Sequence, residues 1–134
     1  MHTLLLMPVS KMKALPDTLC IDIGGTGVKL IVVDAKGTEL CDRQRCETPH
    51  PGTPEAIIGV IAGLTKQVPE FDRIAVGFPG VVRNGIIETA ANLDLSWPGT
   101  NLSKELEKRL NKPTRVANDA DVQGYACVSG KGVE

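Results

Sequence analysis

The stretch CIDIGGTGVKLIVV at residues 20–33 constrains the fold more than any other part of the chain. Two β-rich runs, residues 18–23 and 28–34, are joined by GGTG, a pattern typical of a β-hairpin. The second run, VKLIVVD, is apolar at both odd and even positions. Because apolar side chains on both faces of a strand have to be buried, we expect this strand to be covered on both sides.

Strands and helices alternate after this hairpin. The further expected strands are residues 38–46, 73–78 and 115–118, together with a small hairpin over residues 81–89 that turns at RNG. Three helices are expected: one capped by Thr53 with the apolar stripe Ile57, Ile61, Leu64 and Val68, one capped by Asn101 with Leu102, Leu106 and Leu110, and one from Asp119 toward Ser129. Three meandering strands followed by α/β crossovers predict an α/β fold, a mixed sheet with helices on its faces.

The composition is that of one globular domain and argues against several functions. The 134 residues carry a net charge of −1 and are 3% aromatic, which gives no support for binding to nucleic acid or to an anionic membrane. The four cysteines form no C-x-x-C pair, which argues against a zinc site and for a reducing compartment. Residues 1–17 are interpreted as a flexible leader, and no run is long enough to span a membrane. We therefore expect a cytoplasmic chain.

The motif DIGGTGVK combines features of a phosphate site. Gly24 and Gly25 have no Cβ, so a phosphate can approach the backbone N–H groups, and Thr26 adds a hydroxyl donor. Lys29 supplies a positive charge, and Asp22 could hold Mg²⁺ directly or through water. The alternative is a plain Gly-Gly hairpin that tolerates an acid. The motif is neither a Walker loop nor a G-x-G-x-x-G fingerprint.

Two further motifs follow expected strands. In VANDAD, Asn118 and Asp119 fall where a strand meets a helix, the usual ligand position in open α/β sheets. Asp119 could accept the proton of an attacking hydroxyl, with Asn118 orienting the substrate, or Asp119 could simply cap the helix. The stretches GFPG and TAANLDLSWPG place Gly80 and Asn92 in loops, and Trp97 is either a rim or a core residue.

Taken together, DIGGTGVK, GFPGVV, TAANLDLSW and ANDAD resemble, in order and spacing, the sugar kinases of the ROK family. The resemblance covers residues 18–134 and is strongest to the branch that phosphorylates glucose with inorganic polyphosphate or ATP. It implies the N-terminal lobe of a two-lobe kinase with the actin-like, hexokinase-like ATPase fold, which is ribonuclease H-like.

The resemblance also implies roles for individual residues. Asp119 would be the general base that takes the proton of the sugar 6-hydroxyl. The sugar hydroxyls would be bound by Gly80, Asn92, Asn118 and Asp119, and the phosphoryl donor, ATP or polyphosphate, by Gly24, Gly25, Thr26 and Lys29. Asp22 would lie near Mg²⁺. The expected partner is a small-molecule sugar, without nucleic acid or membrane, in a full-length homo-oligomer.

Three departures from the family pattern bear on this interpretation. Leu95 replaces a lysine that is typical of the polyphosphate-using relatives, and Cys127 replaces a frequent acid. The chain ends where the second lobe should begin, so we expect it to be inactive alone. The alternatives are a sugar-sensing regulator of the same family, or a kinase for another hexose such as N-acetylmannosamine or fructose.

Overall fold

The computed structural model describes residues 15–122, and for residues 121 and 122 it describes the backbone only. Most of the expected leader, the continuation of the last expected helix and Cys127 lie outside the described residues. No helix among residues 15–122 is long and apolar enough to cross a lipid bilayer.

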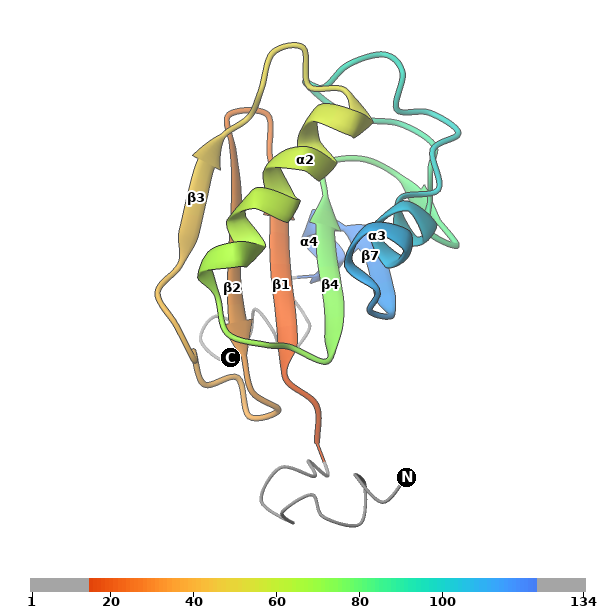
Figure 1. The fold of residues 1–134 in the computed structure, drawn as a ribbon. Helices are drawn as coiled ribbons and strands as arrows, with labels where there is room; N and C mark the ends of the chain where they lie inside the picture. Colours follow the sequence, from red (N-terminus) through yellow and green to blue (C-terminus); the bar gives the residue numbers. More distant parts are fainter. Residues whose placement is uncertain (1–14, 123–134) are drawn as a thin grey trace.

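A five-stranded mixed sheet organises the described residues (Figure 1), with the strand order β3-β2-β1-β4-β7. Its strands are β1 (Thr18–Ile23), β2 (Gly27–Val33), β3 (Gln44–Glu47), β4 (Arg73–Phe78) and β7 (Thr114–Asn118). The first three form an antiparallel meander, whereas β4 and β7 run parallel to β1. The expected mixed sheet, three antiparallel strands followed by α/β crossovers, is therefore confirmed.

The third strand is shorter than expected from residues 38–46. After β2, the Asp34 carboxylate accepts hydrogen bonds from the Lys36 and Thr38 N–H groups at 2.8 and 2.9 Å, which closes a turn. These two donors hold the pKa of Asp34 below its usual value. The chain forms one isolated bridge between Val33 and Glu39 and pairs regularly only from Gln44. The intervening residues 40–43 are largely exposed, so a longer ladder at this edge would bury little apolar surface.

Two helices lie beside the sheet. Helix α2 (Pro54–Leu64) begins behind Thr53, whose hydroxyl accepts the Ala56 N–H at 3.2 Å. Helix α3 (Leu102–Leu110) begins behind Asn101, whose side chain accepts the Lys104 N–H at 3.1 Å. Both expected caps are confirmed. The predicted apolar stripe extended to Val68, which is too far. A short 3₁₀ turn, η2 (Thr65–Gln67), follows α2, and Val68 lies beyond it.

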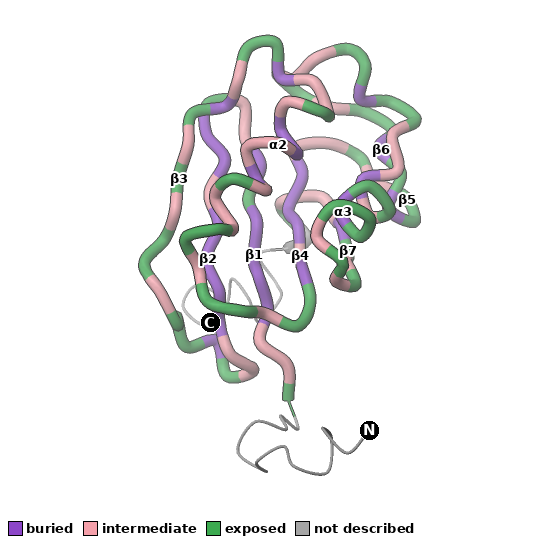
Figure 2. Tube along the Cα trace, in the orientation of Figure 1, coloured by how far each residue is buried: buried purple, intermediate pink, exposed green. Residues whose placement is uncertain are grey.

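The core lies between α2 and the sheet. Figure 2 shows buried residues along β1, β2 and β4, whereas β3 alternates between intermediate and exposed residues. One apolar cluster joins inward-facing side chains of these strands to Ile57 and Ile61 of α2. On the opposite face of the sheet, Cys20, Ile31 and Val33 are buried in a second cluster. The prediction that the second strand is covered on both faces is confirmed.

The small hairpin consists of β5 (Val82–Arg83) and β6 (Ile86–Ile87). Its turn residues Asn84 and Gly85 both have positive φ angles, 55° and 83°. Such angles match the right-handed twist of the two strands, which explains why Asn-Gly serves here. The last described element, α4 (Asp119–Val122), follows β7 directly and contacts β4 and β7.

Candidate functional site at the carboxyl edge of the sheet

The predicted site residues lie where β1, β4 and β7 end. In the parallel register Asp22 is opposite Gly77, and Gly77 is opposite Ala117. The turn after β1, the loop after β4 and the start of α4 after β7 therefore meet at one edge of the sheet (Figure 1). The carboxyl edge of parallel strands is where open α/β sheets usually bind ligands.

The turn between β1 and β2 is held by a residue that follows β3. The Thr48 hydroxyl donates to the Gly24 carbonyl at 2.6 Å, and the Thr48 N–H donates to the Thr26 carbonyl at 3.1 Å. Within the turn, the Gly24 N–H donates to the Gly27 carbonyl at 2.9 Å. Thr48 is 3% exposed, so these bonds are shielded from water. The turn therefore has a fixed shape, although 24 residues separate Gly24 from Thr48.

The outer side of this turn presents unused donors. Within residues 15–122, neither the Gly25 nor the Thr26 N–H donates a hydrogen bond. Lys29 lies opposite Asp22 in the antiparallel register, with Nζ 4.0 Å from the carboxylate, and both side chains are partly exposed. A loose, solvated pair of this kind contributes little to stability. Backbone donors beside an available ammonium group are suited to an anion.

Asn92 packs against this turn from the loop after the small hairpin. A Cβ added to Gly25 would lie 2.9 Å from the Cβ of Asn92, so the two backbones approach closely because Gly25 has no side chain. Asn92 itself has a φ of 61°, in the left-handed region. The neighbouring Ala91 N–H donates to the Pro79 carbonyl at 2.8 Å. The loop therefore connects the GGTG turn to the turn at GFPG.

Gly80 and Asn118 connect the next pair of motifs. The Asn118 amide Nδ2 donates to the Gly80 carbonyl at 2.8 Å, and its Oδ1 accepts the Ala120 N–H at 2.9 Å. The first turn of α4 is thus stabilised by Asn118, not by the Asp119 side chain that the capping alternative invoked. A Cβ on Gly80 would overlap the Thr89 carbonyl, so only glycine fits at this position.

Asp119 is partly buried at the start of α4. No residue in the described part of the chain forms a hydrogen bond or an ion pair with its carboxylate. A carboxylate without a protein partner is available as a proton acceptor. The structure therefore brings the turn, Asn92, Gly80 and Asn118 into one connected edge, with Asp119 at its end.

Trp97 is a core residue, which decides between the two predicted alternatives. Its side chain is fully buried, its ring centroid is 4.8 Å from that of Phe78, and its indole Nε1–H donates to the Gly52 carbonyl at 2.7 Å. In the same loop the Asp94 carboxylate accepts the N–H and hydroxyl of Ser96, and these hydrogen bonds lower the pKa of Asp94. Leu95, between them, is 94% exposed.

Two residues near the turn were missed from the sequence. Thr48 was not singled out, because no local signal indicates a contact with Gly24. Arg45 lies opposite Lys29 in the register of β2 and β3, and a Cβ on Gly27 would lie 2.6 Å from its Nη2. The pairing of the third strand could have indicated Arg45, but the register depends on where that strand begins.

Asp22 offers a divalent cation a carboxylate beside the turn at this edge. Residues 15–122 contain no cluster of three or more His, Cys, Asp or Glu side chains placed to share a metal. Mg²⁺ in phosphoryl-transfer sites usually keeps several waters and takes one or two carboxylates together with substrate phosphates. The exposed carboxylate of Asp22 beside the turn is compatible with that mode of binding.

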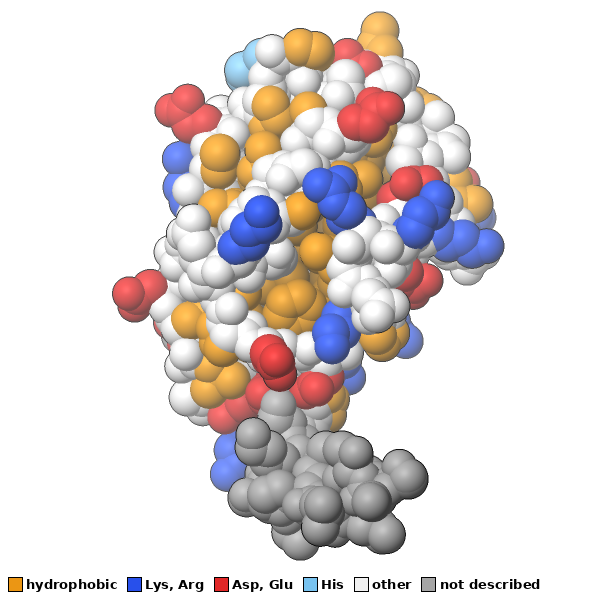
Figure 3. Space-filling view, viewed as in Figure 1, with side chains coloured by type: hydrophobic (Ala, Val, Ile, Leu, Met, Phe, Trp, Pro, Cys, Tyr) orange, Lys and Arg blue, Asp and Glu red, His pale blue; other side chains and the backbone are white. Residues whose placement is uncertain are grey.

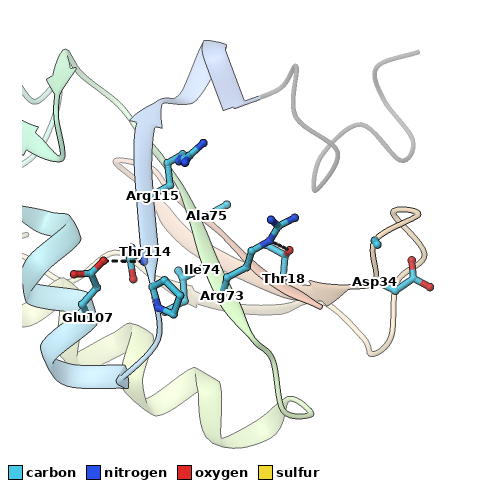
Figure 4. Close-up of a pocket in the computed structure, with 10 residues that line it drawn as sticks. Thr18, Asp34, Arg73, Ile74, Ala75, Glu107, Thr114 and Arg115 are labelled. Carbon is cyan, nitrogen blue, oxygen red and sulfur yellow. Dashed lines mark hydrogen bonds between the residues drawn. The ribbon is translucent and has the colours of Figure 1, made fainter. Parts of the chain in front are cut away.

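A cavity of about 400 Å³ lies at the opposite, amino edge of the parallel strands (Figure 4). Thr18, Arg73 and Thr114, which begin β1, β4 and β7, line it together with Glu107 and Arg115. Its polar groups already bind one another, since Arg73 donates to Thr18 at 2.8 Å and the Thr114 N–H donates to Glu107 at 3.1 Å. None of the predicted site residues lines this cavity. On the α2 side of the molecule, acidic and basic side chains are interspersed (Figure 3).

Comparisons with known proteins agree on one family. Residues 18–130 match the family described as ROK family. A polyphosphate glucokinase of Mycobacterium tuberculosis is 39% identical over 108 residues, which cover 79% of this chain and 41% of that protein. An N-acetylmannosamine kinase of Escherichia coli is 34% identical over 114 residues, or 81% of this chain and 38% of that protein. The inorganic polyphosphate/ATP-glucomannokinase of Arthrobacter sp. strain KM superposes with a TM-score of 0.75 at 38% identity, covering 88% of this chain and 51% of that chain.

Proposed function

The chain belongs to the ROK family and has the actin-like ATPase fold of its sugar kinases, and from this premise we propose that it is the sugar- and phosphate-binding lobe of a hexose kinase. The reaction would transfer a phosphoryl group to the 6-hydroxyl of glucose. Residues 18–134 would form the N-terminal lobe and residues 1–17 a leader. The chain spans less than half the length of the curated relatives it matches.

One observation carries this proposal: the motifs are connected in space. Gly25 contacts Asn92, the Ala91 N–H donates to Pro79, and Asn118 donates to Gly80. Each motif alone is compatible with an ordinary loop. Their connection along one sheet edge, which ends at the Asp119 carboxylate without a partner among residues 15–122, supports transfer from a phosphate donor to a hydroxyl.

The residues of β7 and α4 would act on the acceptor sugar. Asp119 would accept the proton of the attacking hydroxyl, while Asn92 and the remaining Asn118 N–H would bind other sugar hydroxyls. Gly80 would not contact the sugar hydroxyls through its own polar groups in this proposal. Its N–H donates to Phe78 at 2.9 Å and its carbonyl accepts from Asn118, so it would shape the sugar site by close backbone packing.

The β1–β2 turn would bind the donor. The N–H groups of Gly25 and Thr26 and the ammonium group of Lys29 would compensate the charge of the transferring phosphoryl group, and Gly24 would allow close approach. Asp22 would hold Mg²⁺, which supplies charge neutralisation to the donor phosphates when bound. A relative whose name includes polyphosphate and ATP supports either compound as donor.

Glucose is favoured over other hexoses by the more similar curated relative. The polyphosphate glucokinase is 39% identical to this chain and the N-acetylmannosamine kinase is 34% identical. We infer that a second lobe is needed to complete the donor site and exclude water, so the 134-residue chain alone would not turn over. The complete kinase would be a homo-oligomer.

Calorimetric titration of the chain with glucose tests the sugar site. We expect glucose to bind, and Asp119→Asn to weaken binding about 10- to 100-fold, since hydrogen bonds to a charged group are worth about 1.5–3 kcal/mol. Asp42→Asn, an exposed acid away from the edge, is the matched control and should bind as the parent does. In a kinase that contains this lobe, Asp119→Asn should lower kcat by about 10²–10⁴-fold. Absence of binding to both glucose and N-acetylmannosamine would reject the sugar site.

A further inference from the structure

We propose that Arg45 is an additional phosphate-binding residue that extends the donor site along β3 and fits it to linear polyphosphate. This inference rests on the proposed donor role of the β1–β2 turn. Neither the composition nor the motif DIGGTGVK pointed to it, because Arg45 lies 16 positions after Lys29 in the sequence. Its support comes from strand register, packing and charge.

The register places three charged side chains in a row. Asp22 of β1 is opposite Lys29 of β2, and Lys29 is opposite Arg45 of β3. Directly paired residues project from the same face of a sheet, and neighbouring strands are about 4.8 Å apart. The row therefore runs across the strands, from the Asp22 carboxylate on β1 over the Lys29 ammonium group on β2 to the Arg45 guanidinium on the edge strand β3.

Arg45 is exposed to solvent, and its guanidinium lies beside the turn. A Cβ added to Gly27 would lie 2.6 Å from Nη2, 2.9 Å from Cζ and 3.0 Å from Nε of Arg45. The guanidinium thus occupies the space beside the Gly27 backbone, one residue after Thr26. Gly27 allows this approach because it has no side chain.

The charge of Arg45 is not compensated by the protein. Among the described residues, no Asp or Glu forms an ion pair with Arg45, although Glu47 lies two positions along the same face of β3. Arg43, by contrast, pairs with Glu39 at 3.8 Å. A guanidinium presents several N–H donors that bind phosphate oxygens in a bidentate manner.

Two cations on adjacent strands favour a donor that carries charge on consecutive phosphates. In linear polyphosphate every unit along the chain is anionic, so Lys29 and Arg45 could contact successive units. In ATP the charge ends at three phosphates and a nucleoside follows. Arg45 should therefore contribute more to polyphosphate binding than to ATP binding, and the difference should decrease with added salt.

The test is calorimetric titration of the 134-residue chain with linear polyphosphate of defined length and, separately, with ATP. We expect Arg45→Gln to weaken polyphosphate binding about three- to tenfold, the effect of losing one charge-assisted contact, and to change ATP binding less. Arg43→Gln removes the same charge from the same segment away from the turn and should bind as the parent does. Arg45→Lys should be intermediate, because it keeps the charge without the bidentate geometry. Thermal melts of each variant verify that it is folded.

The remaining outcomes separate this inference from the proposed function. If Lys29→Gln weakens polyphosphate binding and Arg45→Gln does not, the donor site stands and the role of Arg45 is wrong. If Arg45→Gln and Arg43→Gln weaken polyphosphate binding equally, the net charge of the protein explains the effect and the inference is overturned. If neither the parent chain nor a kinase that contains this lobe binds polyphosphate or ATP, the donor site itself is rejected, and the role of Arg45 with it.

Discussion

Gly80 and Gly25 act through the side chains that they lack. At Gly80 the backbone of Thr89 occupies the position where a Cβ would be, and at Gly25 the side chain of Asn92 does so. Both contacts join a turn at the edge of the sheet to the loop that carries Asn92. At the scale of single residues, the shape of the candidate site therefore depends on close backbone approach, which only glycine permits.

Gly80→Ala should destabilise the protein by about 2 kcal/mol or more, because the added methyl group overlaps a backbone carbonyl that cannot move independently. Chemical unfolding followed by circular dichroism measures the change in the free energy of unfolding. Gly59→Ala is the matched control: Gly59 lies inside α2 with nothing within 4 Å of the added Cβ. That variant should be more stable by about 0.5–1 kcal/mol, since alanine favours helix. If Gly80→Ala is as stable as the parent protein, the loop can shift to make room for the methyl group.

At the scale of elements, specific hydrogen bonds hold the loops at the carboxyl edge. Thr48 bonds the GGTG turn through two hydrogen bonds, and Asn118 joins α4 to the turn at Gly80. The loop over residues 89–97 contains its own turn, in which the Asp94 carboxylate accepts both Ser96 donors. These local bonds explain how residues without regular secondary structure can present side chains in fixed positions.

The Asp94 turn should lose stability in acid. Hydrogen bonds from Ser96 lower the pKa of Asp94 in the folded protein below its usual value of 3.8. The stabilising contribution is therefore fully present above about pH 4. It is lost as the pH falls through the lower folded-state pKa. Titration of the Asp94 carboxyl carbon by nuclear magnetic resonance should give a midpoint below 3.8.

Ser96→Ala removes the hydroxyl donor and should return the midpoint of Asp94 toward its usual value. Because Asp94 is partly exposed to solvent, the effect on global stability should be small. A midpoint at or above the usual value in the parent protein would contradict the assigned hydrogen bonds.

At the scale of the whole molecule, Trp97 joins parts of the chain that are far apart in sequence. It contacts Phe78 of β4 and donates to Gly52, 45 residues away, in the segment that precedes α2. The loop that carries Asn92 is thereby fixed to the core as well as to the turn at Gly25. Site geometry and global folding should consequently be coupled.

Trp97→Phe should lower the free energy of unfolding by about 2–3 kcal/mol, because it leaves a cavity and removes the indole hydrogen bond to the Gly52 carbonyl, which keeps only the longer bond from the Asp94 N–H at 3.4 Å. Urea unfolding followed by circular dichroism measures this change. Leu95→Ala is the control from the same loop; this side chain is 94% exposed and its loss should cost less than about 0.5 kcal/mol. If the two variants are equally stable, the loop is not part of the cooperative core.

Sequence patterns were sufficient to predict most elements and to identify the residues whose side chains can bind ligands or transfer protons. Local patterns were sufficient for the β1–β2 hairpin, the caps Thr53 and Asn101 and the Asn-Gly turn, because each depends on neighbours along the chain. The order of the elements along the chain indicated the mixed sheet. The site residues were found through motif chemistry and family resemblance, and their functional roles remain predictions. The predictions of the length of β3 and of the end of the apolar stripe in α2 were wrong, since hydrogen bonds in turns and solvent exposure decide where these elements begin and end.

Only the tertiary structure decided which of these residues meet. The contact of Gly25 with Asn92, the bond from Thr48 to Gly24 and the placement of Arg45 beside Gly27 all join separate strands or loops. No local pattern encodes such contacts, because strand register and close packing depend on the whole sheet. The structure also assigned Trp97 to the core and the stabilisation of the α4 start to Asn118. Asp119 was thereby left without a protein partner in the described residues, and this is a property of the assembled edge rather than of its sequence.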